Sequence, residues 1–176
     1  MKDHACSWLR ILGAAITAGA IATAVPAANP GEPRAARTVR VTGAGFDDLR
    51  GAIVHSKRPT ATGLIQVSTA TVELSGDLHG RVLYQVTTVI DQQAGTLANT
   101  GDQVFSGTVA GSDPVMLHDA RFRFDENLKS GTDRGSVYLV DHIAGPQVRC
   151  TLQVTGTGKD GDGNPTFTYS GECEFA

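Results

Sequence analysis

The sequence lacks the short motifs by which many enzymes and cofactor-binding domains are identified. Its 176 residues contain no Gly-x-Ser-x-Gly nucleophile turn, no His-Glu-x-x-His zinc motif, no phosphate-binding loop and no Cys-x-x-Cys pair. Helical periodicity is also missing after the N-terminal region. The best helical candidate, residues 47–55, contains Gly51, which weakens a helix. The sequence therefore predicts no cofactor, no metal site and no helical layer.

Cysteine and positive charge are scarce. The chain has three cysteines, 15 basic residues and 18 acidic residues. After residue 28 the chain keeps two cysteines, Cys150 and Cys173, with 13 basic and 17 acidic residues. Its net charge is then −4 when histidine is counted as neutral. This balance argues against a nucleic acid or an anionic membrane as partner, because both favour a basic surface.

The N-terminal residues 1–28 have the pattern of a secretory signal peptide. Lys2 and Arg10 precede an uncharged apolar run at residues 11–25, and small residues follow at the cleavage position. The alternative is an uncleaved anchor, but a spanning helix needs about 20 apolar residues. We therefore expect cleavage, export and no membrane attachment afterwards. Residues 29–37, rich in proline, are predicted to be a flexible leader before a domain at residues 38–176.

Apolar residues alternate with polar ones through most of this domain. At residues 115–125, for example, Met116, Ala120 and Phe122 fall on one face, and the charged Asp119 and Arg121 fall on the other, which is expected to face solvent. Strands are predicted near residues 38–42, 64–74, 79–90, 102–110, 115–125, 135–143, 147–156 and 166–175, with glycine-rich turns between them. Eight short strands with short connections favour an all-β fold, a single antiparallel eight-stranded barrel of the up-and-down type. A β-sandwich is the alternative.

The last two predicted strands allow a test of register. When Cys150 is placed opposite Cys173, Val154 faces Tyr169 on an apolar side and Arg149 meets Glu174 on a polar side. Two cysteines in an exported chain also indicate one disulfide. A Cys150–Cys173 bond across this hairpin is therefore predicted.

The tip of that hairpin, residues 159–166 with the sequence KDGDGNPT, partly matches a calcium-binding loop. Asp160, Asp162 and Asn164 stand at alternate positions as such a loop requires. The glycine and the final glutamate of the motif are replaced by Pro165 and Gly171. Because these residue types are also those that turns use, we interpret the segment as a plain turn.

Histidine and aromatic side chains supply the candidate site. His118 shares the predicted inner face of its strand, where it could move a proton or, alternatively, be a hydrogen-bonded core residue. His142 and Tyr138 share a second face, and His118 and His142 would need a third ligand to hold a metal. We therefore predict His118, Tyr138 and His142 as catalytic residues. The expected ligand-binding residues are Tyr84, Phe122 and Tyr169, although such tyrosines also serve as core residues bonded to the backbone.

Three glycine-punctuated segments carry a resemblance to a known family. These are VELSGDLHG at residues 72–80, VFSGTVAG at residues 104–111 and the closing VTGTGKDGDGNPTFTYSGEC at residues 154–173. In layout they resemble the small eight-stranded barrels of the allene oxide cyclase and dirigent type, which are calycin-like. The resemblance covers residues 40–175 and includes no catalytic motif. It implies an exported barrel that steers cyclisation or coupling of an apolar small molecule without a cofactor.

Three functions are consistent with these observations. The first is a cofactor-independent cyclase or isomerase acting on an apolar small molecule inside the barrel. The second is a lipocalin-like carrier that uses the same cavity without chemistry. The third is an extracellular interaction or inhibitor module that acts through residues 91–101 and 126–134. A cavity lined by histidine and tyrosine would favour the first, an entirely apolar cavity the second, and a filled interior the third.

Overall fold

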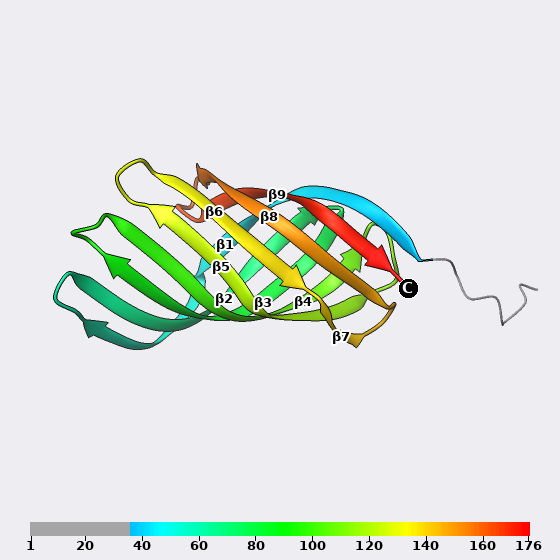
Figure 1. The fold of residues 1–176 in the computed structure, drawn as a ribbon, viewed down its shortest axis with the longest axis horizontal. Helices are drawn as coiled ribbons and strands as arrows, with labels where there is room; N and C mark the ends of the chain where they lie inside the picture. Colours follow the sequence, from blue (N-terminus) through cyan, green and yellow to red (C-terminus); the bar gives the residue numbers. More distant parts are fainter. Residues whose placement is uncertain (1–35) are drawn as a thin grey trace, which may run out of the picture. The chain divides into compact units, whose positions relative to one another are not determined.

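Nine antiparallel strands make up most of residues 36–176, the part of the chain that the computed structural model describes (Figure 1). The strands are β1 Arg37–Pro59, β2 Gly63–Gly76, β3 Leu78–Asp91, β4 Thr96–Val109, β5 Val115–Asn127, β6 Thr132–Leu139, β7 Asp141–Ala144, β8 Val148–Lys159 and β9 Pro165–Phe175. The predicted signal peptide and nearly all of the predicted leader lie outside the described residues. Within that range, no helix is long and apolar enough to cross a bilayer.

Eight of these strands close into an up-and-down barrel. Their hydrogen-bonded order is β4-β3-β2-β1-β9-β8-β6-β5, and the pairing of β4 with β5 completes the circle. The barrel prediction is therefore confirmed and the sandwich alternative is wrong. β7 is an additional short strand beside β5, because the predicted strand at residues 135–143 is interrupted at Val140. Closure leaves no continuous sheet edge along the barrel.

The β8–β9 hairpin has the predicted register. Cys150 pairs with Cys173, and Val154 with Tyr169, as the alternation of the two strands required. Arg149 and Glu174 form the expected ion pair at 3.0 Å. The disulfide is present, with its two Cα atoms 4.1 Å apart. Cross-linking this hairpin stabilises the domain by roughly 2–4 kcal/mol, chiefly by restricting the unfolded chain.

The hairpin tip is the predicted turn. The carboxylate of Asp160 accepts the backbone N–H groups of Asp162 and Asn164 at 2.9 and 2.8 Å, and the Asn164 amide at 3.0 Å. Asn164 is 2% exposed, and its side-chain oxygen accepts the backbone N–H of Leu49 at 3.4 Å. The aspartate and asparagine of the apparent calcium motif therefore fasten the turn to itself and to β1.

The predicted phase of β5 is wrong for its first half. Val115, Leu117 and Asp119 point inward, whereas Met116 is exposed and His118 faces outward. A β-bulge between the pairs Gly101–Phe122 and Gln103–Asp119 inserts one extra residue and reverses the alternation. Beyond it, Phe122 points inward as predicted. Asp119, which was expected to face solvent, is 1% exposed.

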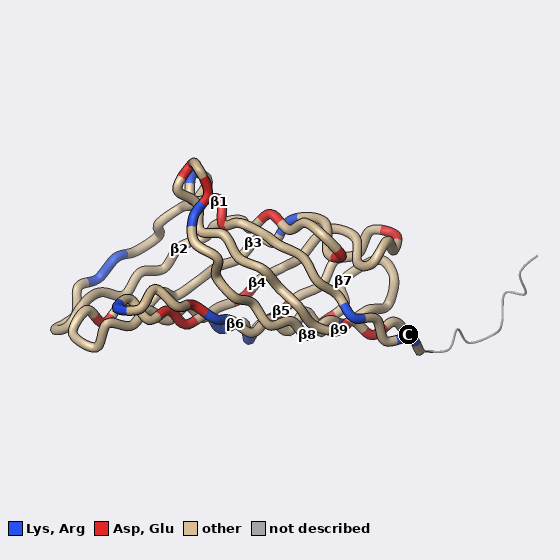
Figure 2. The backbone as a smooth tube through the Cα atoms, turned by 90° about the horizontal axis from the view of Figure 1, so that it is seen from above, with Lys and Arg blue, Asp and Glu red and all other residues tan. Residues whose placement is uncertain are grey.

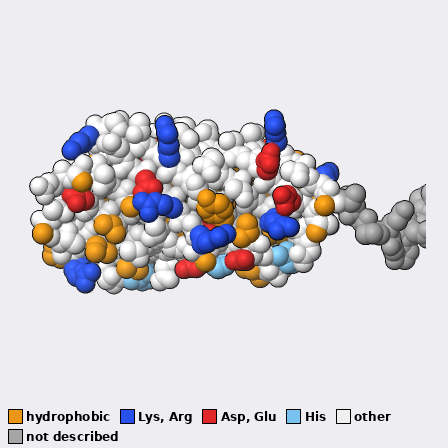
Figure 3. Space-filling view, viewed as in Figure 1, with side chains coloured by type: hydrophobic (Ala, Val, Ile, Leu, Met, Phe, Trp, Pro, Cys, Tyr) orange, Lys and Arg blue, Asp and Glu red, His pale blue; other side chains and the backbone are white. Residues whose placement is uncertain are grey.

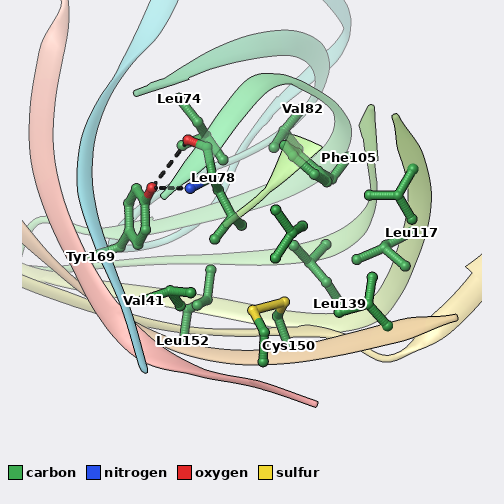
Figure 4. Close-up of a cluster of buried hydrophobic side chains, with 14 residues drawn as sticks. Val41, Leu74, Leu78, Val82, Phe105, Leu117, Leu139, Cys150, Leu152 and Tyr169 are labelled. Atoms are coloured by element: carbon green, nitrogen blue, oxygen red, sulfur yellow. Dashed lines mark hydrogen bonds between the residues drawn. A yellow bond between two sulfur atoms is a disulfide. The ribbon is translucent and has the colours of Figure 1, made fainter. Parts of the chain in front are cut away.

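The interior is packed at one end of the barrel, which we call the filled end. The core cluster there includes Leu78, Phe105, Leu117, Leu139 and the disulfide, and Figure 4 shows these side chains converging from opposite walls. Tyr169 lies at the edge of the cluster and reaches the β2–β3 turn with its hydroxyl. The β4–β5 connection and β7 also lie at this end.

The opposite end, which we call the open end, has walls of unequal length. β9 pairs with β1 only from Arg37 to Phe46, whereas β1 continues along β2 as far as Pro59. The β1–β2, β3–β4 and β5–β6 hairpins therefore project beyond the β8–β9 turn (Figure 1). Basic residues lie on the projecting part of β1, and acidic residues are dispersed along the barrel (Figure 2). The helical candidate at residues 47–55 is a strand with an irregular stretch between Asp48 and Ile53.

Candidate functional site in the barrel interior

A cavity of about 180 Å³ lies between the filled end and the mouth of the barrel. All eight barrel strands contribute to its wall, and most of the lining side chains are apolar. The wall consists of Asp47, Val72, Leu74, Val82, Tyr84, Asn99, Gln103, Phe122, Arg123, Phe124, Gly135, Val137, Leu139, Leu152, Val154, Pro165, Phe167 and Tyr169. Leu74, Leu139 and Leu152 belong also to the packed core or border it, so the core is the floor of the cavity.

Glycines on the inner face give the aromatic side chains of the wall their space. A Cβ atom on Gly135 would come within 2.7 Å of the Phe124 ring, which belongs to the residue paired with it across β5 and β6. A Cβ atom on Gly43 would lie 2.2 Å from the hydroxyl of Tyr169, again the cross-strand partner. Small residues on one strand therefore accommodate the large side chains of the next strand, which lets the rings lie across the interior.

Asp47 and Tyr84 form the polar centre of the wall. The Tyr84 hydroxyl donates to the Asp47 carboxylate, with both oxygens at 2.8 Å. The Tyr84 ring meets Phe122 edge-on, with ring centroids 6.1 Å apart. Burial raises the pKa of Asp47 above its ordinary value, the neighbouring Asp48 adds to this, and the hydrogen bond from Tyr84 opposes it. Burial and the negative charge of Asp47 also raise the pKa of Tyr84 well above its usual range.

Two amide side chains complete the polar part of the wall. The Asn99 side-chain oxygen is buried and has no hydrogen-bond partner within residues 36–176. Gln103 donates instead to the Asp119 carboxylate at 3.0 Å. Asp119 also accepts the backbone N–H groups of Arg121 and Tyr138, both at 2.7 Å. Asp119 is thus committed to the backbone at the bulge, while Asn99 leaves an acceptor unused.

Tyr169 serves the fold at the floor of the site. Its hydroxyl accepts the backbone N–H of Leu78 at 2.8 Å and lies within hydrogen-bond distance of the Ser75 and Leu78 carbonyl oxygens, at 3.0 and 3.1 Å. Burial raises the pKa of this phenol, and the hydrogen bond at Leu78 opposes the shift. The phenol is therefore occupied by the β2–β3 turn, and only its ring faces the cavity.

The predicted ligand-binding residues line this cavity, whereas the predicted catalytic residues do not. Tyr84, Phe122 and Tyr169 are all wall residues. His118 lies on the outer face, where its ring nitrogens are each 3.3 Å from a carboxylate, of Asp102 and of Asp141. Its expected inward placement is wrong because the bulge in β5 reverses the side-chain alternation. Figure 3 shows histidine side chains reaching the surface.

Tyr138 and His142 also lie away from the cavity. In β6 the inward positions are Val137 and Leu139, so Tyr138 faces outward, where the Arg121 guanidinium lies 5.3 Å from its ring centroid. His142 follows the interruption at Val140 and contacts the Gly145 carbonyl oxygen at 2.9 Å, beside a separate hollow at the filled end. The prediction that His118, Tyr138 and His142 lie together inside the barrel is therefore wrong: none of the three lines the cavity.

Asp47 and Asn99 are wall residues that were not predicted from the sequence. Asp47 was assigned to a helical candidate, and its inward orientation follows from its pairing with Val72. Asn99 was assigned to a turn, although it shares one alternating face with Gln103 and the core residue Phe105. That alternation was a usable signal, since a polar residue in phase with a buried phenylalanine is expected to face the interior.

The fold and the cavity together define a class of protein: a small up-and-down antiparallel barrel, packed at one end and hollow at the other. The chain matches no protein-family model, no curated protein and no solved structure. The barrel layout by itself identifies no specific family, so the resemblance to allene oxide cyclase and dirigent barrels stays a prediction.

Proposed function

We propose that this barrel binds a small organic molecule in the cavity at its open end. The observation that carries the proposal is the wall itself, which is mainly apolar and includes the buried Asp47–Tyr84 pair and the unpartnered oxygen of Asn99. Binding sites commonly combine an apolar lining with a few polar groups that orient the ligand. The Asp47 carboxylate receives only the Tyr84 hydroxyl and keeps spare acceptor positions, so a ligand that donates a hydrogen bond fits this wall.

The volume of the cavity limits the size of the ligand. At about 180 Å³ it is smaller than the roughly 300–1,000 Å³ of sites for drug-sized molecules. It is close to the roughly 150 Å³ apolar cavity that binds benzene in another protein. The expected ligand therefore has one ring, or an apolar group of similar size, with a short polar arm. The wall has more polar groups than a purely apolar carrier site requires.

Cofactor-independent isomerisation or cyclisation is a second candidate, supported by the Asp47–Tyr84 pair. Burial raises the pKa of Asp47, which brings a carboxyl group closer to the range where it accepts and returns a proton. This pair takes the place of the histidines predicted from sequence. The interaction-module hypothesis predicted a filled interior. The cavity therefore does not support it.

The disulfide is compatible with an extracellular location, and we propose that the domain acts there. Structural disulfides persist mainly in oxidising compartments. The Cys150 and Cys173 side chains are 1% and 0% exposed, so external reductants have poor access to the bond. An exported binding protein of this kind would therefore keep its disulfide intact in the extracellular medium.

A cavity-filling variant tests the binding proposal. Val137 lies in the wall, so Val137→Trp should occupy the cavity, whereas Val89→Trp adds the same ring at a position that is 43% exposed. Native mass spectrometry and NMR titration with single-ring compounds should detect binding to the wild type and to Val89→Trp. Binding should be lost in Val137→Trp. Equal binding by both variants would place the ligand elsewhere and contradict the proposal.

Catalysis is tested separately with Asp47→Asn, which keeps a hydrogen-bond acceptor for Tyr84 but removes the proton acceptor. A carrier should release the bound compound chemically unchanged from both wild type and variant. An isomerase should convert it in the wild type and lose conversion by about 10²-fold or more in the variant. Recovery of unchanged compound from the wild type after prolonged incubation would exclude the second candidate for that compound.

A further inference from the structure

We propose that the ligand of the barrel cavity is a small organic cation, with an ammonium group attached to an apolar body. This inference rests on the binding function proposed above and specifies its ligand class. It is drawn from the hydrogen-bonding groups, charges and aromatic rings that line the cavity. The ammonium would lie against the Asp47 carboxylate, and the apolar body would lie among the aromatic side chains.

The polar side of the cavity offers a hydrogen-bond acceptor, the Asp47 carboxylate, that is only partly used. The Asp47 carboxylate receives one proton donor, the Tyr84 hydroxyl, at 2.8 Å. A carboxylate has about four acceptor positions, so Asp47 keeps spare capacity. The Asn99 side-chain oxygen is buried without a partner within the described residues. An ammonium group supplies up to three N–H donors from one atom, which suits the free acceptor positions of the Asp47 carboxylate.

No basic side chain of the wall is available to neutralise Asp47. Arg123 is the one basic residue among the described residues that line the cavity, and its guanidinium is held by Asp125 at 2.6 and 2.7 Å. Both of these side chains are largely exposed. A buried carboxylate that lacks a cationic partner disfavours an anionic ligand and favours a cationic one.

Two acidic side chains face each other near the mouth of the cavity. Glu126 and Asp133 are paired directly across β5 and β6, on the inner-facing positions of both strands near the open end. Neither forms an ion pair with any of the described residues. Like charges at directly opposed positions destabilise a sheet, so this arrangement costs stability that a cation entering the mouth would offset.

Aromatic rings surround the same space. Tyr84, Phe122, Phe124 and Phe167 all belong to the wall. Cations are attracted to the faces of aromatic rings within about 6 Å of the ring centroid, most strongly where water is excluded. The carboxylate and the ring faces each favour an ammonium group over a neutral group of the same shape.

Three probes of similar shape separate charge from size: benzylammonium, ethylbenzene and benzoate. Their binding to the disulfide-bonded domain is followed at pH 7 by NMR titration of the wall residues. Benzylammonium should bind at least about tenfold more tightly than the other two, as expected for hydrogen bonds to a charged group. Asp47→Asn should reduce this preference to about threefold or less. Asp113→Asn, a matched change at an exposed residue of the β4–β5 turn, should leave it unchanged.

The outcomes distinguish the two levels of the proposal. Ethylbenzene binding as tightly as benzylammonium would overturn the cation inference and leave the binding function standing. Tightest binding of benzoate would overturn the inference as well. If none of the three probes shifts the wall resonances, the proposed binding function itself fails. The ranking in the wild type decides between these outcomes even where Asp47→Asn folds poorly.

Discussion

Tyr169 shows how one side chain can connect two distant parts of a barrel. Its hydroxyl serves the Leu78 N–H and two carbonyl oxygens, and these groups are separated from it by more than 90 residues in the chain. The close approach requires Gly43 on the neighbouring strand, where a Cβ atom would overlap the phenol. The hydroxyl thereby fixes the β2–β3 turn against the filled core.

Tyr169→Phe should lower the free energy of unfolding by about 1–3 kcal/mol, because it leaves the buried Leu78 N–H without an acceptor. Tyr138→Phe is the matched control, since Tyr138 is on the outer face and only its backbone N–H takes part in the hydrogen bonds described above. Urea denaturation of both variants measures the difference. Equal stability of the two variants would show that the Tyr169 hydroxyl contributes little.

Asp47 is expected to reduce the stability of the fold at neutral pH. Burial raises its pKa in the folded state, so the contribution of the neutral carboxyl is fully present below the unfolded value of about 3.9. This contribution is lost as the pH rises through the higher folded value. Asp47→Asn should therefore be more stable than the wild type at pH 7, and the difference should disappear near pH 3.

Urea denaturation between pH 3 and pH 8 checks this, with the exposed Asp113→Asn as a control that should follow the wild type at all pH values. A variant that is less stable than the wild type at pH 7 would contradict the sign. Functional groups are often retained at the expense of the fold, and a cavity carboxylate that lowers stability would fit the proposed binding site.

At the scale of the strand, the bulge in β5 depends on Asp119. This carboxylate accepts the Arg121 and Tyr138 backbone N–H groups and the Gln103 amide. Asp119→Ala should cost about 3 kcal/mol or more, because three donors in a buried region lose their acceptor. Asp125→Ala, on the exposed face of the same strand, should cost about 1 kcal/mol or less. Chemical denaturation that finds the two variants equally stable would contradict this role.

The same strand explains where prediction from the sequence succeeded and failed. The β8–β9 register was predictable because the two cysteines fix one pair, and alternation is uninterrupted from Val148 to Gly156. In β5 an extra residue lies opposite Asp102, and no glycine or proline within β5 itself marks the position. Without that signal the apolar Met116, Ala120 and Phe122 align on one face in the sequence but not in the fold. The misplacement of His118 follows from this single residue.

The cavity was predictable only in part for a related reason. Tyr84, Phe122 and Tyr169 were found because local alternation places each of them inside. Asp47 depends on the long-range pairing of β1 with β2 and β9, and the irregular stretch after Asp48 hides the strand periodicity. Hydrogen bonding between Asp47 and Tyr84, 37 residues apart, is a property of the closed barrel and not of either segment.

At the scale of the whole molecule, the projecting part of β1 is an exposed strand edge. From Ile53 to Pro59 it pairs with β2 on one side and has no strand partner on the other within the described residues. Ile53 and Val54 are 60% and 53% exposed there. Such edges promote association between chains unless charge or proline blocks them, and Lys57, Arg58 and Pro59 protect only the end.

Ile53→Lys combined with Val54→Lys should therefore reduce concentration-dependent self-association, measured by light scattering. The thermal midpoint should change little, because both side chains are largely solvated. Leu83→Lys combined with Val89→Lys, at positions on β3 that are 54% and 43% exposed, controls for the two added charges. Equal reduction by the control would assign the effect to net charge and not to the strand edge.

Because only one end of the barrel is packed, the backbone hydrogen bonds at the two ends of the same strand should open at different rates. Near Leu78 and Val82, β3 crosses the packed core beside the disulfide; near Ile90 it stands in the projecting wall. Native-state hydrogen exchange should find the amides near Val82 protected up to global unfolding, and those near Ile90 released by small local fluctuations. A ligand would then enter through local opening at the rim of the open end, while the packed, disulfide-linked end of the barrel stays folded.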